Sequence, residues 1–149
     1  MSERKNLFNP SVKQEIIQRI NTLNNGSSPI WGKMSAAQMF KHCSLILQIA
    51  LQNPKHKRTI MGRIFGPLIK ISVVGPKPFK KNGFTPKIFK VETEENFEVR
   101  KKELLELVQR FTPENVSDKV HPMFGLLTDE EWGQSQYKHL DHHLSQFGA

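Results

Sequence analysis

Two histidines near the end of the chain have the type and spacing of metal ligands. His139 and His143 lie four residues apart in the stretch TDEEWGQSQYKHLDHHLSQFG, residues 128–148. In an α-helix, side chains four apart stack on one face at a separation of about 6 Å. Both imidazoles can then reach one ion. The alternative is a pair of core histidines whose ring nitrogens are satisfied by hydrogen bonds.

A third histidine, His42, belongs to another apolar helical pattern, beside Met39 and Ile46. If the two helices face each other, His42 joins His139 and His143. Three imidazoles leave one or more positions of an ion open, which is typical of a catalytic site. Nitrogen ligands suit zinc, nickel, iron or copper, and zinc or nickel is our expectation. Cys43 points about 100° away from His42 and is expected to be a small core residue, with a reactive thiol as the alternative.

Two further histidines are candidates for supporting roles in a second shell or substrate pocket. His142 points about 100° away from His143, which indicates a surface or supporting position. His121 precedes Pro122 in a loop before the last helix. It is a candidate fourth ligand or proton shuttle, or alternatively a loop histidine that bonds a helix end. The pattern assigns no catalytic residue.

Helical periodicity and start signals predict four helices that position these residues. The predicted spans are residues 9–24, 35–52, 93–111 and 128–148. Two of them begin with a capping box, formed by Ser35 with Gln38 and by Thr128 with Glu131. Residues 53–92 form a long, basic connection rich in proline and glycine, with a short helix possible in residues 60–74, interrupted by Gly66-Pro67. The only candidate strand lies around residues 88–91. The fold class is therefore all-α, a four-helix bundle with a long crossover between the second and third helices.

The bulk properties indicate one domain, residues 1–149, in a reducing cytoplasm. A single cysteine excludes an intrachain disulfide. The sequence has no run of about 18 apolar residues, so it predicts no membrane-spanning helix. The start of the chain lacks the apolar region of a signal peptide. We therefore expect a cytoplasmic protein without a membrane partner.

The charge is distributed very unevenly. The net charge is +8, yet residues 16–91 contain thirteen Lys and Arg and no Asp or Glu. Such a segment indicates an anionic partner, a match to the acidic remainder of the chain, or a solvated basic surface. Nucleic acid is not expected, because the sequence lacks an RNP-like motif, zinc-finger spacing and a helix-turn-helix.

Several sequence blocks resemble the DinB superfamily, in particular a subfamily of small bacterial DinB-like proteins. They are WGKMS at residues 31–35, QMFKHC at 38–43, and the block from His121 to Gly148 with HLDHH followed by Gln146. The resemblance covers nearly the whole chain. It implies an up-down-down-up bundle, a divalent ion held by His42, His139 and His143, and a homodimer. Gln146 joins His121 and His142 as a possible supporting or pocket residue.

The resemblance also suggests an activity. Some superfamily members resemble metal-dependent transferases that use a low-molecular-weight thiol, and the basic segment can attract a small anionic substrate. Fold-level analogy is weak support for function. The alternatives are a stress-related binding module with an inert metal site and, less favoured, a nucleic-acid binder through the basic half.

Overall fold

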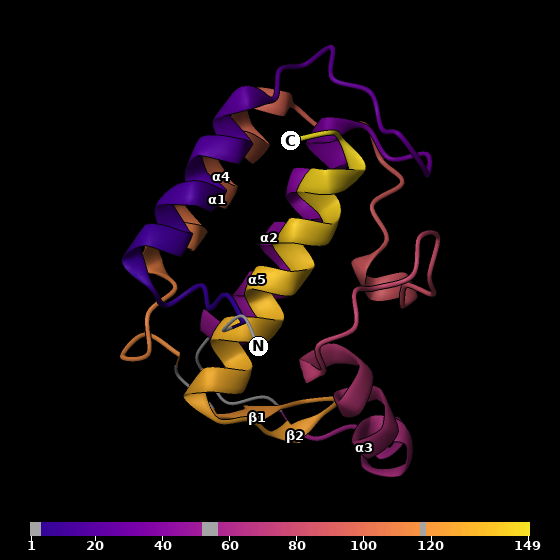
Figure 1. The fold of residues 1–149 in the computed structure, drawn as a ribbon. Helices are drawn as coiled ribbons and strands as arrows, with labels where there is room; N and C mark the ends of the chain where they lie inside the picture. Colours follow the sequence, from indigo (N-terminus) through magenta and orange to yellow (C-terminus); the bar gives the residue numbers. More distant parts are fainter. Residues whose placement is uncertain (1–3, 52–56, 117–118) are drawn as a thin grey trace.

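The computed structural model describes residues 4–51, 57–116 and 119–149, and these residues are mostly helical (Figure 1). They form five α-helices, one 3-10 turn and one small antiparallel hairpin. In chain order the elements are α1 (Pro10–Thr22), α2 (Ala36–Leu51), α3 (Ile60–Val74), η1 (Lys87–Phe89), α4 (Phe97–Arg110), β1 (Val120–His121), β2 (Gly125–Leu126) and α5 (Asp129–Gln146).

Four of the helices enclose one hydrophobic core. α2 packs most extensively on α4, α4 also contacts α1, and α5 contacts both α1 and α2, so the contacts close a ring. In Figure 1, α1 and α4 lie together on one side, and α5 lies in front of α2. The largest fully buried side chains include Phe40, Leu47, Leu104, Trp132 and Leu140.

The two helices that carry the histidines begin where the capping boxes predicted. The Gln38 amide accepts a hydrogen bond from Ser35 N–H at 2.9 Å, and the Ser35 hydroxyl accepts one from Gln38 N–H at 3.1 Å. The same exchange joins Thr128 and Glu131 at the start of α5. These bonds satisfy backbone donors that the first helical turn leaves unpaired, and they fix where each helix begins.

The prediction that Gly66-Pro67 interrupts the helix in residues 60–74 was wrong. α3 continues through Gly66 and Pro67 for 15 residues. Pro67 removes the hydrogen bond to the carbonyl of Arg63, but both residues are exposed, so water can replace the lost donor. The following helix, α4, begins later than predicted because Asn96 caps it by accepting from Val99 N–H at 3.0 Å.

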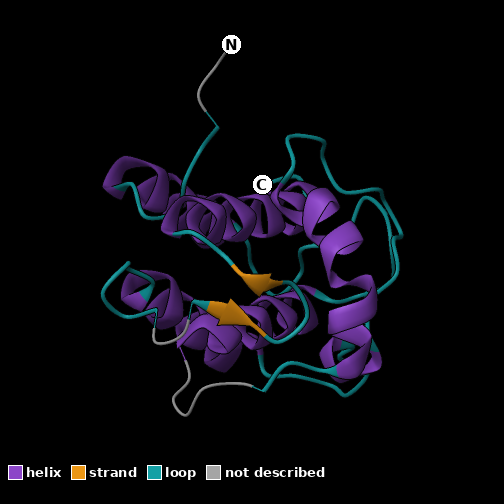
Figure 2. Ribbon diagram, turned by 90° about the horizontal axis from the view of Figure 1, so that it is seen from below, coloured by secondary structure: helices purple, strands orange, loops and turns teal. Residues whose placement is uncertain are grey.

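Strands form where none were expected. The candidate around residues 88–91 overlaps the 3-10 turn, whereas β1 and β2 pair in the linker before α5, with Val120 opposite Leu126. Figure 2, viewed from below Figure 1, shows this hairpin in front of the helices. Two-residue strands are too short for an alternating pattern to reveal them in sequence.

α3 lies outside the ring of helices and contacts α5 and the hairpin. It approaches the hairpin through its glycines. A Cβ atom at Gly62 would lie 2.6 Å from the Pro122 carbonyl oxygen and 2.8 Å from Met123 Cα, and one at Gly66 would collide with the Met123 carbonyl. None of the described helices is long and apolar enough to cross a bilayer.

Gly62→Ala is therefore expected to weaken α3, although alanine normally stabilises a helix by about 0.5–1 kcal/mol relative to glycine. Overpacking against backbone atoms costs about 1–3 kcal/mol. Hydrogen exchange of residues 60–74 should show a lower free energy of opening in this variant. Ser72→Ala, at an exposed position of the same helix, is the matched control and should leave exchange unchanged or slower. Equal or slower exchange in Gly62→Ala would contradict the packing described.

Candidate metal centre

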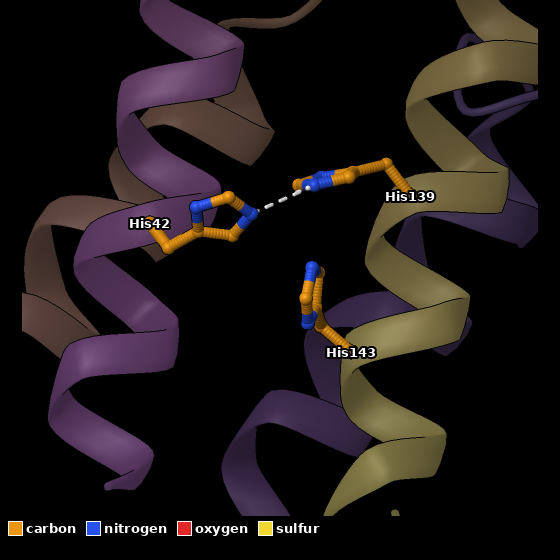
Figure 3. A group of neighbouring side chains, drawn as sticks. All are labelled: His42, His139 and His143. Atoms are coloured by element: carbon orange, nitrogen blue, oxygen red, sulfur yellow. Dashed lines mark hydrogen bonds between the residues drawn. The ribbon is translucent and has the colours of Figure 1, made fainter. Parts of the chain in front are cut away.

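Three imidazoles converge from two helices (Figure 3). His42 comes from α2, while His139 and His143 come from adjacent turns of α5. One potential ligand atom from each ring lies within 4.8 Å of the others, so the group can hold a metal ion. This is the set of residues that the sequence predicted.

The closest pair is formed by the two Nε2 atoms of His42 and His139, 3.1 Å apart. Tetrahedral zinc with bonds of 2.0–2.1 Å keeps its ligand atoms about 3.4 Å apart. The His42–His139 separation of 3.1 Å is close to this value, and a separation at the 4.8 Å limit would have to shorten by about 1.4 Å. Small rotations of the rings can supply that change.

The proton positions on two of the rings are set by their neighbours. His42 Nδ1 lies 2.7 Å from the carbonyl oxygen of Phe89, which can only accept, so Nδ1 carries the proton and Nε2 presents a lone pair. The 3-10 turn η1 thus orients a ligand on α2. Carbonyl groups commonly orient metal-binding histidines in this way.

Gln146 sets the proton position of His143 in the same way, through a hydrogen bond to Nδ1. Its Nε2 donates to the Trp31 carbonyl at 2.8 Å, which turns its Oε1 toward His143 Nδ1 at 2.9 Å. That oxygen accepts, so Nδ1 is protonated and Nε2 is left with a lone pair. Gly32 permits the approach, since its φ of +81° suits glycine and a Cβ there would lie 2.5 Å from Gln146 Nε2.

His139 differs from the other two. Its Nδ1 is buried and has no hydrogen-bond partner among the described residues. A buried nitrogen without a partner is uncommon, because leaving it unpaired costs about 1–3 kcal/mol. In this ring, therefore, only the contact with His42 selects the tautomer, because the lone pair of His42 Nε2 requires the His139 proton on the facing Nε2.

The electrostatic environment favours neutral imidazoles. Desolvation lowers the pKa of His42, and it lowers that of His139 well below the usual value, with a further contribution from the neighbouring histidines. Desolvation likewise lowers the pKa of His143 to about 3. Neutral imidazole is the form that binds metal. His139 and His143 nevertheless keep part of their surface exposed, so the group is not sealed.

His142 contacts His143 and also lines a cavity of about 420 Å³. Its ring centroid lies 5.1 Å from that of His143, and it also contacts Trp31 and Phe79. Desolvation lowers the pKa of His142 as well. The cavity wall includes the cations Arg4, Lys5, Lys81 and Lys138, the aromatic rings of Trp31, Phe79 and Tyr137, and Asp141.

The other candidates take different positions. His121 is buried in β1, where Nδ1 accepts from the N–H groups of Met123 and Phe124 and the ring stacks on Phe124 at 4.1 Å. The ring therefore binds its own hairpin turn and not a helix end, as the alternative had it, and the ligand group does not include it. Cys43 is fully buried, and desolvation raises the pKa of its thiol, which confirms a core residue. His56 lies outside the described residues.

Sequence reasoning named Gln146, which contacts His143, as a possible supporting residue, but it missed the backbone groups that orient the ligands. Phe89, Trp31 and Gly32 contribute through backbone atoms, which leave no chemical signature in their side chains. Only the Trp31-Gly32 pair gave a signal, as part of the WGKMS block at residues 31–35 that carried the resemblance.

Comparison with known proteins gives a family but no described activity. A family model described as "Protein of unknown function (DUF1569)" matches residues 1–149. The chain belongs to the DUF1569 family. No curated protein and no solved structure matches this DUF1569 chain. The family match does not connect it with the DinB superfamily.

The depressed histidine pKa values predict acid sensitivity of the metal-free DUF1569 protein. Each folded value lies below that of an unfolded histidine, so the unfolded chain binds more protons below about pH 6.5. Stability is complete above this pH and falls as the pH drops toward about 3, the pKa of folded His143. Urea unfolding with a chelator, about one pH unit above and one below 6.5, should show this loss, and His143→Gln should reduce it. A pH-independent free energy of unfolding would contradict desolvated, neutral rings.

Proposed function

We propose that this DUF1569 protein is a metal-dependent enzyme in which His42, His139 and His143 hold a divalent ion, with zinc or nickel favoured. The observation that carries the proposal is the convergence of three imidazole donors within 4.8 Å. Two of them present lone pairs whose direction is fixed by Phe89 and Gln146. The position of His139 supports it further, because its Nε2 already faces His42 Nε2 at 3.1 Å.

The reaction we propose is transfer of a low-molecular-weight thiol to an electrophilic carbon. When bound, such an ion supplies Lewis acidity, which lowers the pKa of a thiol at its open position. The thiol proton passes to solvent, the sulfur forms a bond to carbon, and the leaving group departs with the electron pair of the broken bond. The fold-level likeness to DinB-like thiol transferases, including an up-down-down-up helix order and a homodimer, is part of this proposal.

The cavity beside His142 supports a small anionic substrate. Lys81 Nζ lies 4.4 Å from the Trp31 ring centroid, and Lys138 Nζ lies 4.4 Å from that of Phe79. Asp141 is the one carboxylate among the described wall residues and is paired with Arg19 at 2.7 Å, while Lys5 is paired with Glu15 at 2.6 Å, so Arg4, Lys81 and Lys138 remain as the uncompensated charges. The wall therefore has a positive balance and flat apolar surfaces, which suit an anionic molecule with an apolar portion.

Protein purified without chelator is expected to contain about one equivalent of metal by elemental analysis. His143→Ala should lose it, with an affinity loss above the 10–100-fold typical of removing a supporting hydrogen bond. His142→Ala is the matched control, since it removes the neighbouring imidazole and should keep the metal. Well under one equivalent in the wild type, with no rise in melting temperature on adding zinc or nickel, would refute the metal site.

Turnover separates an enzyme from a module with an inert metal. Metal-loaded protein is expected to accelerate the loss of free thiol when cysteine or glutathione is mixed with an alkyl halide. His142→Ala should raise the KM for the thiol while metal content stays constant. Val99→Gln, on the exposed surface of α4, should leave the rate unchanged. Full metal occupancy without acceleration for any thiol and electrophile pair would favour the inert module.

A further inference from the structure

The outer side of α3 is apolar and exposed. Ile64 is 62% exposed and Leu68 is 71% exposed, and their neighbours on the same side are similar. At 100° per residue these side chains occupy one continuous arc of the helix. We call this the α3 apolar face: Ile60, Met61, Ile64, Phe65, Leu68 and Ile71.

The orientation of α3 is the reverse of that of an ordinary surface helix. An amphipathic helix normally turns its large apolar side chains toward the core and its polar ones toward water. α3 instead turns Gly62 and Gly66 inward, against the backbone of Met123, and its bulky residues outward. Packing on the hairpin therefore does not account for the large residues. Contiguous apolar surface of this kind marks an interaction site.

The segment that contains this face carries charge of one sign in the sequence, although Glu131 of α5 pairs with Lys70 beside it. Residues 57–91 contain nine Lys and Arg and no Asp or Glu. Two of the nine are occupied within the protein, Arg58 by the Gly62 carbonyl and Lys70 by Glu131. The others are exposed: Lys57, Arg63, Lys77, Lys80, Lys81, Lys87 and Lys90. Whatever covers the apolar face must also tolerate these cations.

A second copy of the chain meets that requirement poorly. A closed two-fold dimer through α3 would place the same basic surface on both sides of the contact, and like charges facing each other are unfavourable. Contact between α3 and the acidic half of another copy would be heterologous, which gives rings or open filaments and not a two-fold dimer. An anionic phospholipid surface satisfies both features, since it offers acyl chains to the apolar side chains and headgroup charge to the lysines.

We infer that α3 lies in the surface of a bilayer containing anionic phospholipid, with the α3 apolar face in the acyl boundary and the surrounding cations on headgroups. This differs from our expectation of no membrane partner, which rested on the absence of a spanning segment. A helix of 15 residues that lies in the surface needs no span. The inference is independent of the metal site.

Vesicle co-sedimentation of the full chain tests it. The wild type should bind vesicles of phosphatidylcholine mixed with phosphatidylglycerol, and bind pure phosphatidylcholine far more weakly. Ile64→Gln/Leu68→Gln, which changes no charge, should lower the partition coefficient about tenfold or more. Val99→Gln, at an apolar side chain on α4 that is 55% exposed, is the control and should bind like wild type. Lys77→Gln/Lys80→Gln should weaken binding by roughly fivefold per charge, with strong salt dependence.

Three results would overturn the inference. One is the absence of wild-type binding to phosphatidylglycerol vesicles at low salt. Another is unchanged binding by Ile64→Gln/Leu68→Gln, which would make the interaction purely electrostatic. The third comes from analytical ultracentrifugation without lipid: if the double variant converts a wild-type dimer into a monomer, a second copy of the chain covers the face.

Discussion

The arrangement of the candidate centre depends on one constraint: the imidazoles of His42 and His139 face each other through their Nε2 atoms at 3.1 Å. The Phe89 carbonyl holds the His42 proton on the far side of the ring. The lone pair of His42 Nε2 thus points at the His139 ring, and both rings are desolvated. Without a cation, the contact requires the proton of His139 to lie between the nitrogens, and then His139 Nδ1 has no described partner. A bound ion would use the His42 and His139 nitrogens together, with His143 as the third donor.

The scaffold serves to keep this contact in place. The capping boxes define the starts of α2 and α5, and Arg19 of α1 holds Asp141 of α5 at 2.7 Å. The connection from α3 to α4 contributes the Phe89 carbonyl, and the loop before α2 contributes the Trp31 carbonyl that orients Gln146. Loops that seem only to link helices therefore determine the tautomers of two ligands.

The sequence predicted the donors better than their supports. His139 and His143 follow from helical spacing, and His42 follows from its position on an apolar stripe. The tautomers could not be predicted, because backbone carbonyls set them and any residue type can supply a carbonyl. α3 was only half predicted. Its composition predicts an apolar helix, and the large apolar side chains of a surface helix normally face the core. In α3 they face outward, because Gly62 and Gly66 lie against the backbone of Met123.

The most direct test of the central claim is X-ray absorption spectroscopy at the edge of the metal that co-purifies with the protein. We predict a first shell of nitrogen and oxygen at about 2.0–2.1 Å, with multiple scattering from three imidazoles. The imidazole number should stay at three in His142→Ala, and it should fall to two in His143→Ala that has been reloaded with an excess of the same metal. A sulfur scatterer at about 2.3 Å, or fewer than two imidazoles in the wild type, would contradict a centre built from His42, His139 and His143.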